Sequence, residues 1–441
     1  MVFRCDPDGS NVETLGWNFR NNWEAAVDSF GSIWQSDNDD DGNRGVRINY
    51  VMEYGNYGYR DEFTGKGWRD KRSNMEKEIP DRHWHLNDPG VVPNLILTGA
   101  GSPTGIIIYE GNLFPNLINQ VIHCDAGPNV CRAYPRKNNG AGYDAEMMPI
   151  LSGGKDRWYR PSDVAVGPDG SLFIADWYDP GVGGHGMRDL DRGRIFRVVP
   201  EGHNGYKFTN RDFTSLDGAI RGLLSSDLES RYLGWNALHE MGVDKTQDAL
   251  MKLISDKDKI KRARAAWCLG KMPGAGKTVI DKVSKDLDSD LRIVAIRLAR
   301  QLNYDVVNLI TMLSNDKSPQ VRRECAIALR ELDVKEVPKL WAKLALQHDG
   351  KDRWYLEALG IAAEGKWDEC FKAWIGSGGQ WNTDAGKDIV WRSRSKMAPE
   401  LLVKIVKDPG TKEEEKPKYM RAFDFHSGPE KELALQSLLL E

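Results

Sequence analysis

The sequence predicts a multidomain protein of 441 residues, with an all-β part over residues 1–207 and an all-α part over residues 208–441. Three observations predict this division. The first part holds 28 of the 44 glycines, and the second holds 24 lysines against 6 in the first. Apolar residues alternate with a period of two before residue 207 and recur at spacings of three and four after it. The second part also contains an internal repeat.

The composition excludes several classes of protein. Lys and Arg number 61 against 65 Asp and Glu, a net charge of -4, so no charge excess points to nucleic acid. No stretch reaches the ~18–20 uninterrupted apolar residues of a membrane span. The first residues lack the basic and apolar regions of a signal peptide. The chain is therefore expected to be globular and without a membrane span.

Short strands separated by glycine-rich turns are expected in the first part. Residues 27–37 and 166–176 match each other as a turn, a strand and then an aspartate, and residues 194–199 form the next strand. Pro and Gly supply the φ values that such tight turns need. Repeated hairpins of this kind favour a β-propeller over a sandwich. At ~40–50 residues per blade about four blades fit, so the propeller is expected to lack its first blades.

Paired helices repeat in the second part. Five segments align on arginines spaced 31, 30, 30 and 31 residues apart, namely Arg231, Arg262, Arg292, Arg322 and Arg353. An acidic residue precedes most of them and is expected at the helix N-terminus: Asp227, Asp258, Asp290, Asp316 and Asp352. Helix pairs with this pattern resemble HEAT repeats, which stack into a solenoid. The resemblance implies a scaffold with a protein-binding surface.

Two polar clusters are candidate metal sites. The run Asp37-x-Asp39-x-Asp41-Gly matches the opening of a calcium loop, in which alternating carboxylates converge on one ion. A solvated acidic turn is the alternative. His83 and His85 would share one face of a strand and could bind a metal with Asp88, His123 or His185 as third ligand. The alternative is a structural pair of histidines.

Other residues stay open at the sequence level. His123 and His185 lie in polar clusters near strand ends, as bases or as structural histidines. Cys124 and Cys131 are close enough in sequence to pair or to stay reduced. Six tryptophans belong either to a sugar-stacking surface or to the core; they are Trp17, Trp23, Trp34, Trp84, Trp158 and Trp177.

An ordered set of segments resembles the soluble quinoprotein glucose and sorbosone dehydrogenases. It comprises Phe19-Arg-Asn-Asn-Trp, the run from Asp37 to Asn49, Glu53-Tyr-Gly-Asn-Tyr-Gly-Tyr, Ser102-Pro-Thr-Gly, and the segment from Arg160 to Arg197. The whole chain resembles the membrane-bound dehydrogenases of planctomycete type, which join such a propeller to HEAT repeats. It is identified as a fragment of such a protein.

The resemblance implies a six-bladed propeller that holds pyrroloquinoline quinone and calcium. Arg20, Asn49, Tyr57 and Arg160 are then cofactor-binding residues. The polar clusters at strand ends, rather than the resemblance, make His123 or His185 the candidate base that takes a hydroxyl proton as hydride passes to the quinone. The chain departs from the family pattern in two respects. Val46-Arg-Ile48 replaces an acidic pair, and the blade that carries the family's catalytic histidine is not found.

The leading hypothesis is therefore oxidation of a sugar or alcohol at a propeller-bound quinone. Electrons would pass to an acceptor such as a cytochrome c domain, and the resemblance implies the periplasm or cell envelope. The alternative is a non-catalytic module that binds carbohydrate or protein. Metal-dependent hydrolysis at His83 and His85 is a third possibility.

Overall fold

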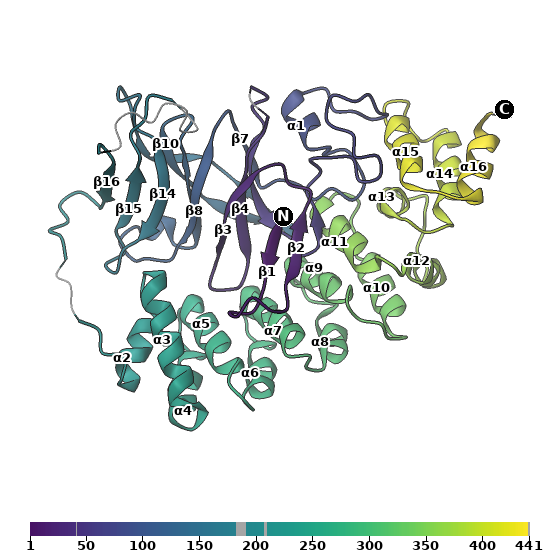
Figure 1. Cartoon of the computed structure of the whole chain (residues 1–441). Coiled ribbons are helices and arrows are strands. Elements are labelled where there is room, and N and C mark those ends of the chain that lie inside the picture. The colour runs from purple at the N-terminus through teal and green to yellow at the C-terminus, as the bar shows by residue number, and fades with distance from the viewer. Residues whose placement is uncertain (41, 182–190, 207–209, 440–441) are drawn as a thin grey trace.

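A computed structural model describes residues 1–40, 42–181, 191–206 and 210–439. The sheets lie together at one side, and the helices run beneath them and rise at the C-terminal end (Figure 1). The last strand ends at Val198 and the first long helix begins at Leu216. The predicted change from strands to helices is thus confirmed. The expected boundary after residue 207 lies outside the described residues.

The β-rich part contains several small antiparallel sheets. Two sheets have four strands, in the orders β3-β4-β5-β7 and β13-β10-β9-β8, and a third has the order β14-β15-β16. A further sheet has the order β1-β2-β6, with β2 and β6 parallel, and β11 pairs with β12. The strands are β1 (Val2–Arg4), β2 (Glu13–Trp17), β3 (Asn22–Val27), β4 (Ile33–Asp37), β5 (Val46–Val51), β6 (Gly55–Asn56), β7 (Ile96–Gly99), β8 (Pro103–Tyr109), β9 (Gln120–Asp125), β10 (Val130–Tyr134), β11 (Arg136–Asn139), β12 (Gly142–Ala145), β13 (Met148–Ser152), β14 (Pro161–Val166), β15 (Leu172–Asp176) and β16 (Arg194–Val198).

Three of these sheets share one structural unit. In each, the second strand ends in a buried aspartate: Asp37, Asp125 or Asp176. The carboxylate accepts a backbone N–H from the residues that precede or begin the first strand, from Asn21 at 2.8 Å, Ser102 at 2.6 Å and Arg160 at 2.7 Å. The first strands β3, β8 and β14 are neighbours in space. The match of residues 27–37 with 166–176 therefore reflects a real repeat, and the third copy escapes a sequence search because its turn is longer.

The helical part is built from short helices in succession. They are α2 (Leu216–Leu223), α3 (Leu228–Met241), α4 (Val243–Leu253), α5 (Lys259–Gly270), α6 (Gly276–Val283), α7 (Ser289–Gln301), α8 (Val306–Leu313), α9 (Pro319–Ala328), α10 (Val337–Ala345), α11 (Arg353–Ala363), α12 (Trp367–Gly376), α13 (Asp384–Arg392), α14 (Ala398–Lys407), α15 (Lys416–Ala422) and α16 (Pro429–Leu439). A short 3₁₀ turn, η2 (Phe423–Phe425), follows α15, and α1 (Ile79–His83) belongs to the β-rich part.

Acidic N-caps begin the repeated helices. Asp227, Asp258 and Asp352 cap α3, α5 and α11 as expected. The cap of α7 is Asp288 rather than Asp290, and α9 follows Ser318 rather than Asp316. In both cases the expected acid lies two residues from the cap.

Two of the five aligned arginines, Arg262 and Arg292, connect neighbouring repeats. Arg262 binds Asp286, and Arg292 binds Asp316 at 2.6 Å, each reaching the loop before the next repeated helix. Both also donate to backbone carbonyls of the loop before their own helix. These arginines therefore fix the spacing of the helix pairs and are structural.

A second set of arginines points from the helices into the sheets. Arg264 and Arg231 bind the buried Glu110 at 3.0 and 2.6 Å. Arg297 donates to Phe30 O and to the Tyr50 hydroxyl, each at 3.1 Å. We call the full set the seam arginines; they are Arg231, Arg264, Arg297, Arg300, Arg323, Arg353, Arg394 and Arg421.

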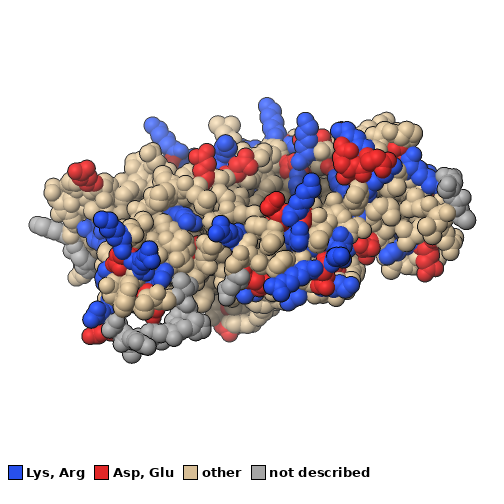
Figure 2. Space-filling model, turned by 90° about the horizontal axis from the view of Figure 1, so that it is seen from above, with Lys and Arg blue, Asp and Glu red and all other residues tan. Residues whose placement is uncertain are grey.

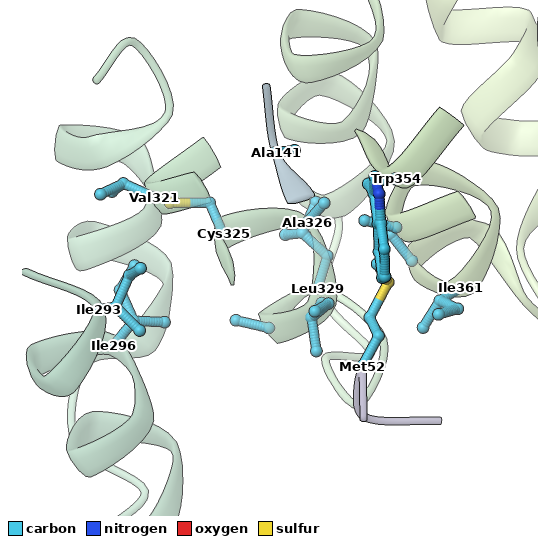
Figure 3. Close-up of a cluster of buried hydrophobic side chains, with 14 of the residues drawn as sticks. Met52, Ala141, Ile293, Ile296, Val321, Cys325, Ala326, Leu329, Trp354 and Ile361 are labelled. Atoms are coloured by element: carbon cyan, nitrogen blue, oxygen red, sulfur yellow. The ribbon is translucent and has the colours of Figure 1, made fainter. Parts of the chain in front are cut away.

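Apolar packing joins the two parts as well. One buried cluster runs from the sheets into the helices, and a smaller one fills the space around Cys124 and Cys131. Figure 3 shows Met52 of the β-rich part beside Trp354 of α11, with Ala141 above the side chains of α9. The helix face expected to bind another protein is thus covered, over this region, by the chain's own sheets.

Glu110→Gln should destabilise the protein strongly. Its carboxylate is 1% exposed and faces two arginines, so the substitution leaves buried cations without their counter-charge. We expect a loss of about 3–5 kcal/mol in the free energy of unfolding, measured by denaturant titration. Glu13→Gln is the control, because its pair with Arg4 is partly exposed and is worth under ~1 kcal/mol. Equal effects from the two variants would contradict a structural role for the seam.

Candidate functional site

A polar cluster lies at the edge of the sheet where β3 and β5 begin and β4 ends, and we call it the Arg20 site. It contains Arg20, Asp40, Asn43, Trp68 and His83. Arg20 donates to one Asp40 oxygen at 2.9 Å, and the Trp68 indole N–H donates to the other at 3.0 Å. His83 Nδ1 lies 3.0 Å from the Asn43 amide nitrogen and 4.0 Å from Asp40.

Four segments bring this site together. Arg20 precedes β3, where its backbone N–H is bound by Asp37 at 3.3 Å. Asp40 and Asn43 lie in the loop between β4 and β5, and His83 ends α1. Trp68 belongs to the long segment between β6 and α1 and packs near the His83 ring. The site therefore depends on loops held by one sheet end.

Burial sets the charges at this site. It lowers the pKa of His83 to about 4, so the imidazole is neutral at physiological pH, and its buried Nε2 has no hydrogen-bond partner among the described residues. Burial opposes ionisation of Asp40, but the Trp68 hydrogen bond and the nearby positive charge outweigh it and lower its pKa. A partly exposed carboxylate thus stands beside a partly exposed guanidinium, with side-chain exposures of 35% and 25%.

The strand expected to hold His83 and His85 is instead the end of a helix. His83 is the last residue of α1, and His85 follows with a φ of 50° and its Nδ1 2.8 Å from Gly58 O. Asp88, one of the expected third ligands, is bound by Arg421 at 2.7 Å. In the described ranges no group of three or more metal-ligating side chains is placed to hold an ion. The assignment of metal to these histidines stays a prediction.

In the acidic loop, Asp37 and Asp39 are bound to other groups of the protein. Asp37 is fully buried, accepts backbone N–H groups at both oxygens and binds Arg47 at 2.8 Å. Asp39 accepts the Gly45 N–H at 2.5 Å. Asp41 lies outside the described residues. Asp37 and Asp39 therefore do not fit a calcium site of converging carboxylates.

The residues that the resemblance assigns to the quinone are also engaged. Asn49 donates to Gln35, and the Tyr57 hydroxyl donates to Tyr50 O and accepts the Met52 N–H. Arg160 donates to backbone carbonyls, among them Ala126 O at 2.8 Å, and is 7% exposed. Side chains that are buried and bonded in this way do not fit a bound quinone. Of the two arginines that the resemblance assigns to the quinone, Arg20 is the one whose guanidinium is partly exposed.

His123 lies inside a sheet, away from solvent. It is fully buried on β9, with Nδ1 3.4 Å from the Tyr134 hydroxyl, and burial lowers its pKa to about 3. This environment is that of a structural histidine. His185, the other expected base, lies outside the described residues. Cys124 and Cys131 face each other on β9 and β10 as free thiols.

The expected aromatic surface divides between core and exterior. Trp34 and Trp84 are fully buried, and Arg47 stacks on Trp84 at 3.5 Å. Trp23 is 68% exposed. Trp68 was missed at the sequence level because no motif surrounds it, and Asp40 was missed because it lies between the alternating positions of the calcium pattern. A pattern search cannot tell which acid of such a run meets an arginine.

Comparisons with known proteins match only parts of the chain. A family model described as a domain of unknown function (DUF7133) matches residues 1–202. No curated protein matches the sequence significantly. A glucose dehydrogenase-type oxidoreductase structure from Thermus thermophilus is 19% identical with a TM-score of 0.30, covering 42% of this chain and 47% of that chain.

Two further solved structures are similar at the same low level. The PQQ-bound aldose sugar dehydrogenase of Streptomyces coelicolor is 18% identical, with a TM-score of 0.29, and the match covers 44% of this chain and 47% of that one. The Escherichia coli protein YibA is 17% identical, with a TM-score of 0.32, and the match covers 51% of this chain and 86% of that one. The chain spans about half the length of the sugar dehydrogenases it matches, and likeness at this level carries no conclusion about function. No helix among the described residues is both long and apolar enough to cross a membrane.

Asp125→Asn should flatten the pH dependence of stability. Burial raises the pKa of Asp125 to about 6, so its contribution is present below its unfolded pKa, about 4, and is lost as pH rises through 6. The amide variant should keep the Ser102 contact and lose this part of the slope in denaturant titrations between pH 4 and 7. Asp28, also raised to about 6, supplies a remaining slope.

Asp176→Asn is the matched comparison, because Asp176 is the same structural position with a cation beside it. Its carboxylate binds Arg194 at 2.6 Å, so the amide should lower stability at pH 7. A loss of stability at pH 7 in Asp125→Asn as large as that in Asp176→Asn would contradict the difference in electrostatics between the two sites.

Proposed function

We propose that the β-rich part binds a neutral, hydroxyl-rich ligand, a sugar or polyol, at the Arg20 site. The observation that carries the proposal is the pair of partly exposed groups there, the ionised Asp40 carboxylate and the Arg20 guanidinium. A carboxylate accepts and a guanidinium donates hydrogen bonds in one plane, so together they suit neighbouring hydroxyl groups. Trp68 acts as a positioning residue, since its indole N–H holds Asp40.

Asp40→Asn tests this proposal. Titration of the full chain with glucose and a panel of neutral sugars and polyols, followed by calorimetry or NMR, should give saturable binding that weakens about tenfold or more in the variant. Trp68→Phe should weaken binding less, because Asp40 stays charged but loses one hydrogen bond. Glu146→Gln, an exposed carboxylate elsewhere in the β-rich part, should have no effect. Absence of saturable binding in the unmodified chain would refute the proposal.

Oxidation of a sugar or alcohol at a quinone is the second candidate. One observation favours it: Arg20 and Arg160 lie within one position of each other in the repeated unit, because each donates a backbone N–H to the aspartate that ends the second strand of its own sheet. In this alternative the sheets are blades of a propeller, PQQ and calcium are cofactors, and a cytochrome c domain accepts electrons in the periplasm or cell envelope. A protein partner would dock on helix surfaces that the sheets leave uncovered.

Dye reduction separates the two candidates. The full chain, supplied with pyrroloquinoline quinone, calcium, a sugar or alcohol and an artificial electron acceptor, should bind sugar without reducing the dye if binding is the function. Dye reduction that requires both the quinone and calcium, and that falls in Arg20→Ala but not in Glu146→Gln, would establish oxidation instead.

A further inference from the structure

A cleft of about 730 Å³ lies between the segment at residues 61–73 and the last helices. The β-rich part supplies one wall, together with His85, and the helical part supplies the other from α15, η2 and α16. Its charged lining residues are carboxylates and cations, and its apolar lining is a pair of phenylalanines. No residue assigned above to the Arg20 site lines it.

The carboxylates of the cleft are already partnered. Asp61 is bound by Arg421 and also accepts the Thr64 N–H at 2.7 Å. Asp424 binds Arg421 at 2.8 Å, and Asp70 accepts the Gly67 N–H at 2.9 Å. The hydrogen-bonding groups of these acids and of Arg421 are therefore used within the protein.

Arg72, another cation of the cleft, has N–H groups without acceptors among the described residues. The Arg72 side chain is 6% exposed, and its Nη2 donates to Glu76 and to Arg82 O. Its Nε and Nη1 are buried without a hydrogen-bond partner in the described part of the chain, and the distance from Nε to Asp88 Oδ1 is 3.9 Å. A buried guanidinium with unused N–H groups is costly unless a ligand satisfies them.

Lysines surround this arginine. Lys66, Lys71 and Lys431 line the cleft, and none of them forms an ion pair with another described residue. Figure 2 shows one face of the molecule, on which basic and acidic side chains are interspersed. Asp70 also forms no ion pair with another described residue, so three lysines face one carboxylate and the net unpaired charge of the cleft is positive.

Two aromatic rings add an apolar surface. Phe63 and Phe425 meet edge to face with ring centres 5.6 Å apart, one from each part of the chain. Phe63 is 60% exposed, although large apolar side chains are usually buried. A ligand with a ring or other apolar body could cover it.

We propose that this cleft binds an organic acid, with a carboxylate or sulfate group at Arg72 and the surrounding lysines and a ring body against Phe63. Planar guanidinium and oxyanion groups form strong, charge-assisted hydrogen bonds, and the volume suits a small molecule. The cleft is distinct from the Arg20 site, because no residue of that site lines it. Trp68 lies in the same segment as Lys66 and Asp70, but its indole N–H donates to Asp40 of the Arg20 site.

Calorimetric titration of the full chain with glucuronate, glucose and inorganic sulfate tests the proposal. Glucuronate should bind, glucose should not bind in the cleft, and sulfate should bind more weakly because it lacks a ring body. Raising the ionic strength from about 0.05 M to about 0.5 M should weaken glucuronate binding. Glucuronate should also raise the unfolding temperature, since both parts of the chain form the cleft.

Variants assign the binding to this cleft. Lys71→Gln and Lys431→Gln should each weaken glucuronate binding about two- to fivefold without changing the unfolding temperature of the free protein. Arg72→Gln should weaken it about tenfold or more. Lys137→Gln, exposed on β11, is the control, and Asp40→Asn should leave glucuronate binding intact even if the Arg20 site binds no sugar. Unchanged affinity for glucuronate in both lysine variants, glucose binding that Lys71→Gln or Lys431→Gln weakens, or sulfate binding as tight as that of glucuronate would overturn the proposal.

Discussion

The seam between sheets and helices depends on buried arginines that need acceptors from the other part of the chain. Arg264 meets Glu110, Arg297 meets the Tyr50 hydroxyl, and Arg323 meets Ala141 O. A buried guanidinium is costly, and an acceptor from the opposite part of the chain offsets much of that cost. Each such helix therefore packs opposite a particular segment of the β-rich part that supplies its acceptor.

The sequence predicts the division and the repeats because both depend on periodicity. It does not predict the seam, because Arg262 and Arg264 lie two residues apart and have the same chemistry, yet one joins two repeats and the other enters the sheets. The direction of each side chain is set by the surface that the helix packs against. The same limit explains the shift of the caps: a run such as Asp286, Asp288 and Asp290 offers several equivalent choices, and tertiary contacts select one.

At the candidate sites, residue type was a weaker guide than satisfaction of hydrogen bonds. Arg160, Asn49 and Tyr57 have side chains suited to a cofactor, but the fold uses the Arg160 guanidinium, the Asn49 amide nitrogen and the Tyr57 hydroxyl internally. Asp40 and Arg72 are not key positions of any motif in the sequence. In the structure, however, Asp40 keeps a partly exposed carboxylate and Arg72 keeps buried N–H groups without acceptors in the described part of the chain. Whether a polar side chain has acceptors or donors left over depends on contacts between distant segments, which a single sequence does not display.

The shared core also has a consequence for synthesis. The ribosome releases the sheets before any of the helices, and domains generally fold as units in that order. Here Met52 and the Tyr50 ring lie against side chains that are made several hundred residues later. Until α9 and α11 emerge, this surface is apolar and exposed, and until α3 and α5 emerge Glu110 lacks Arg231 and Arg264. The nascent protein thus passes through a stage in which it is open to aggregation, and a chaperone that covers the unfinished seam would shorten that exposure.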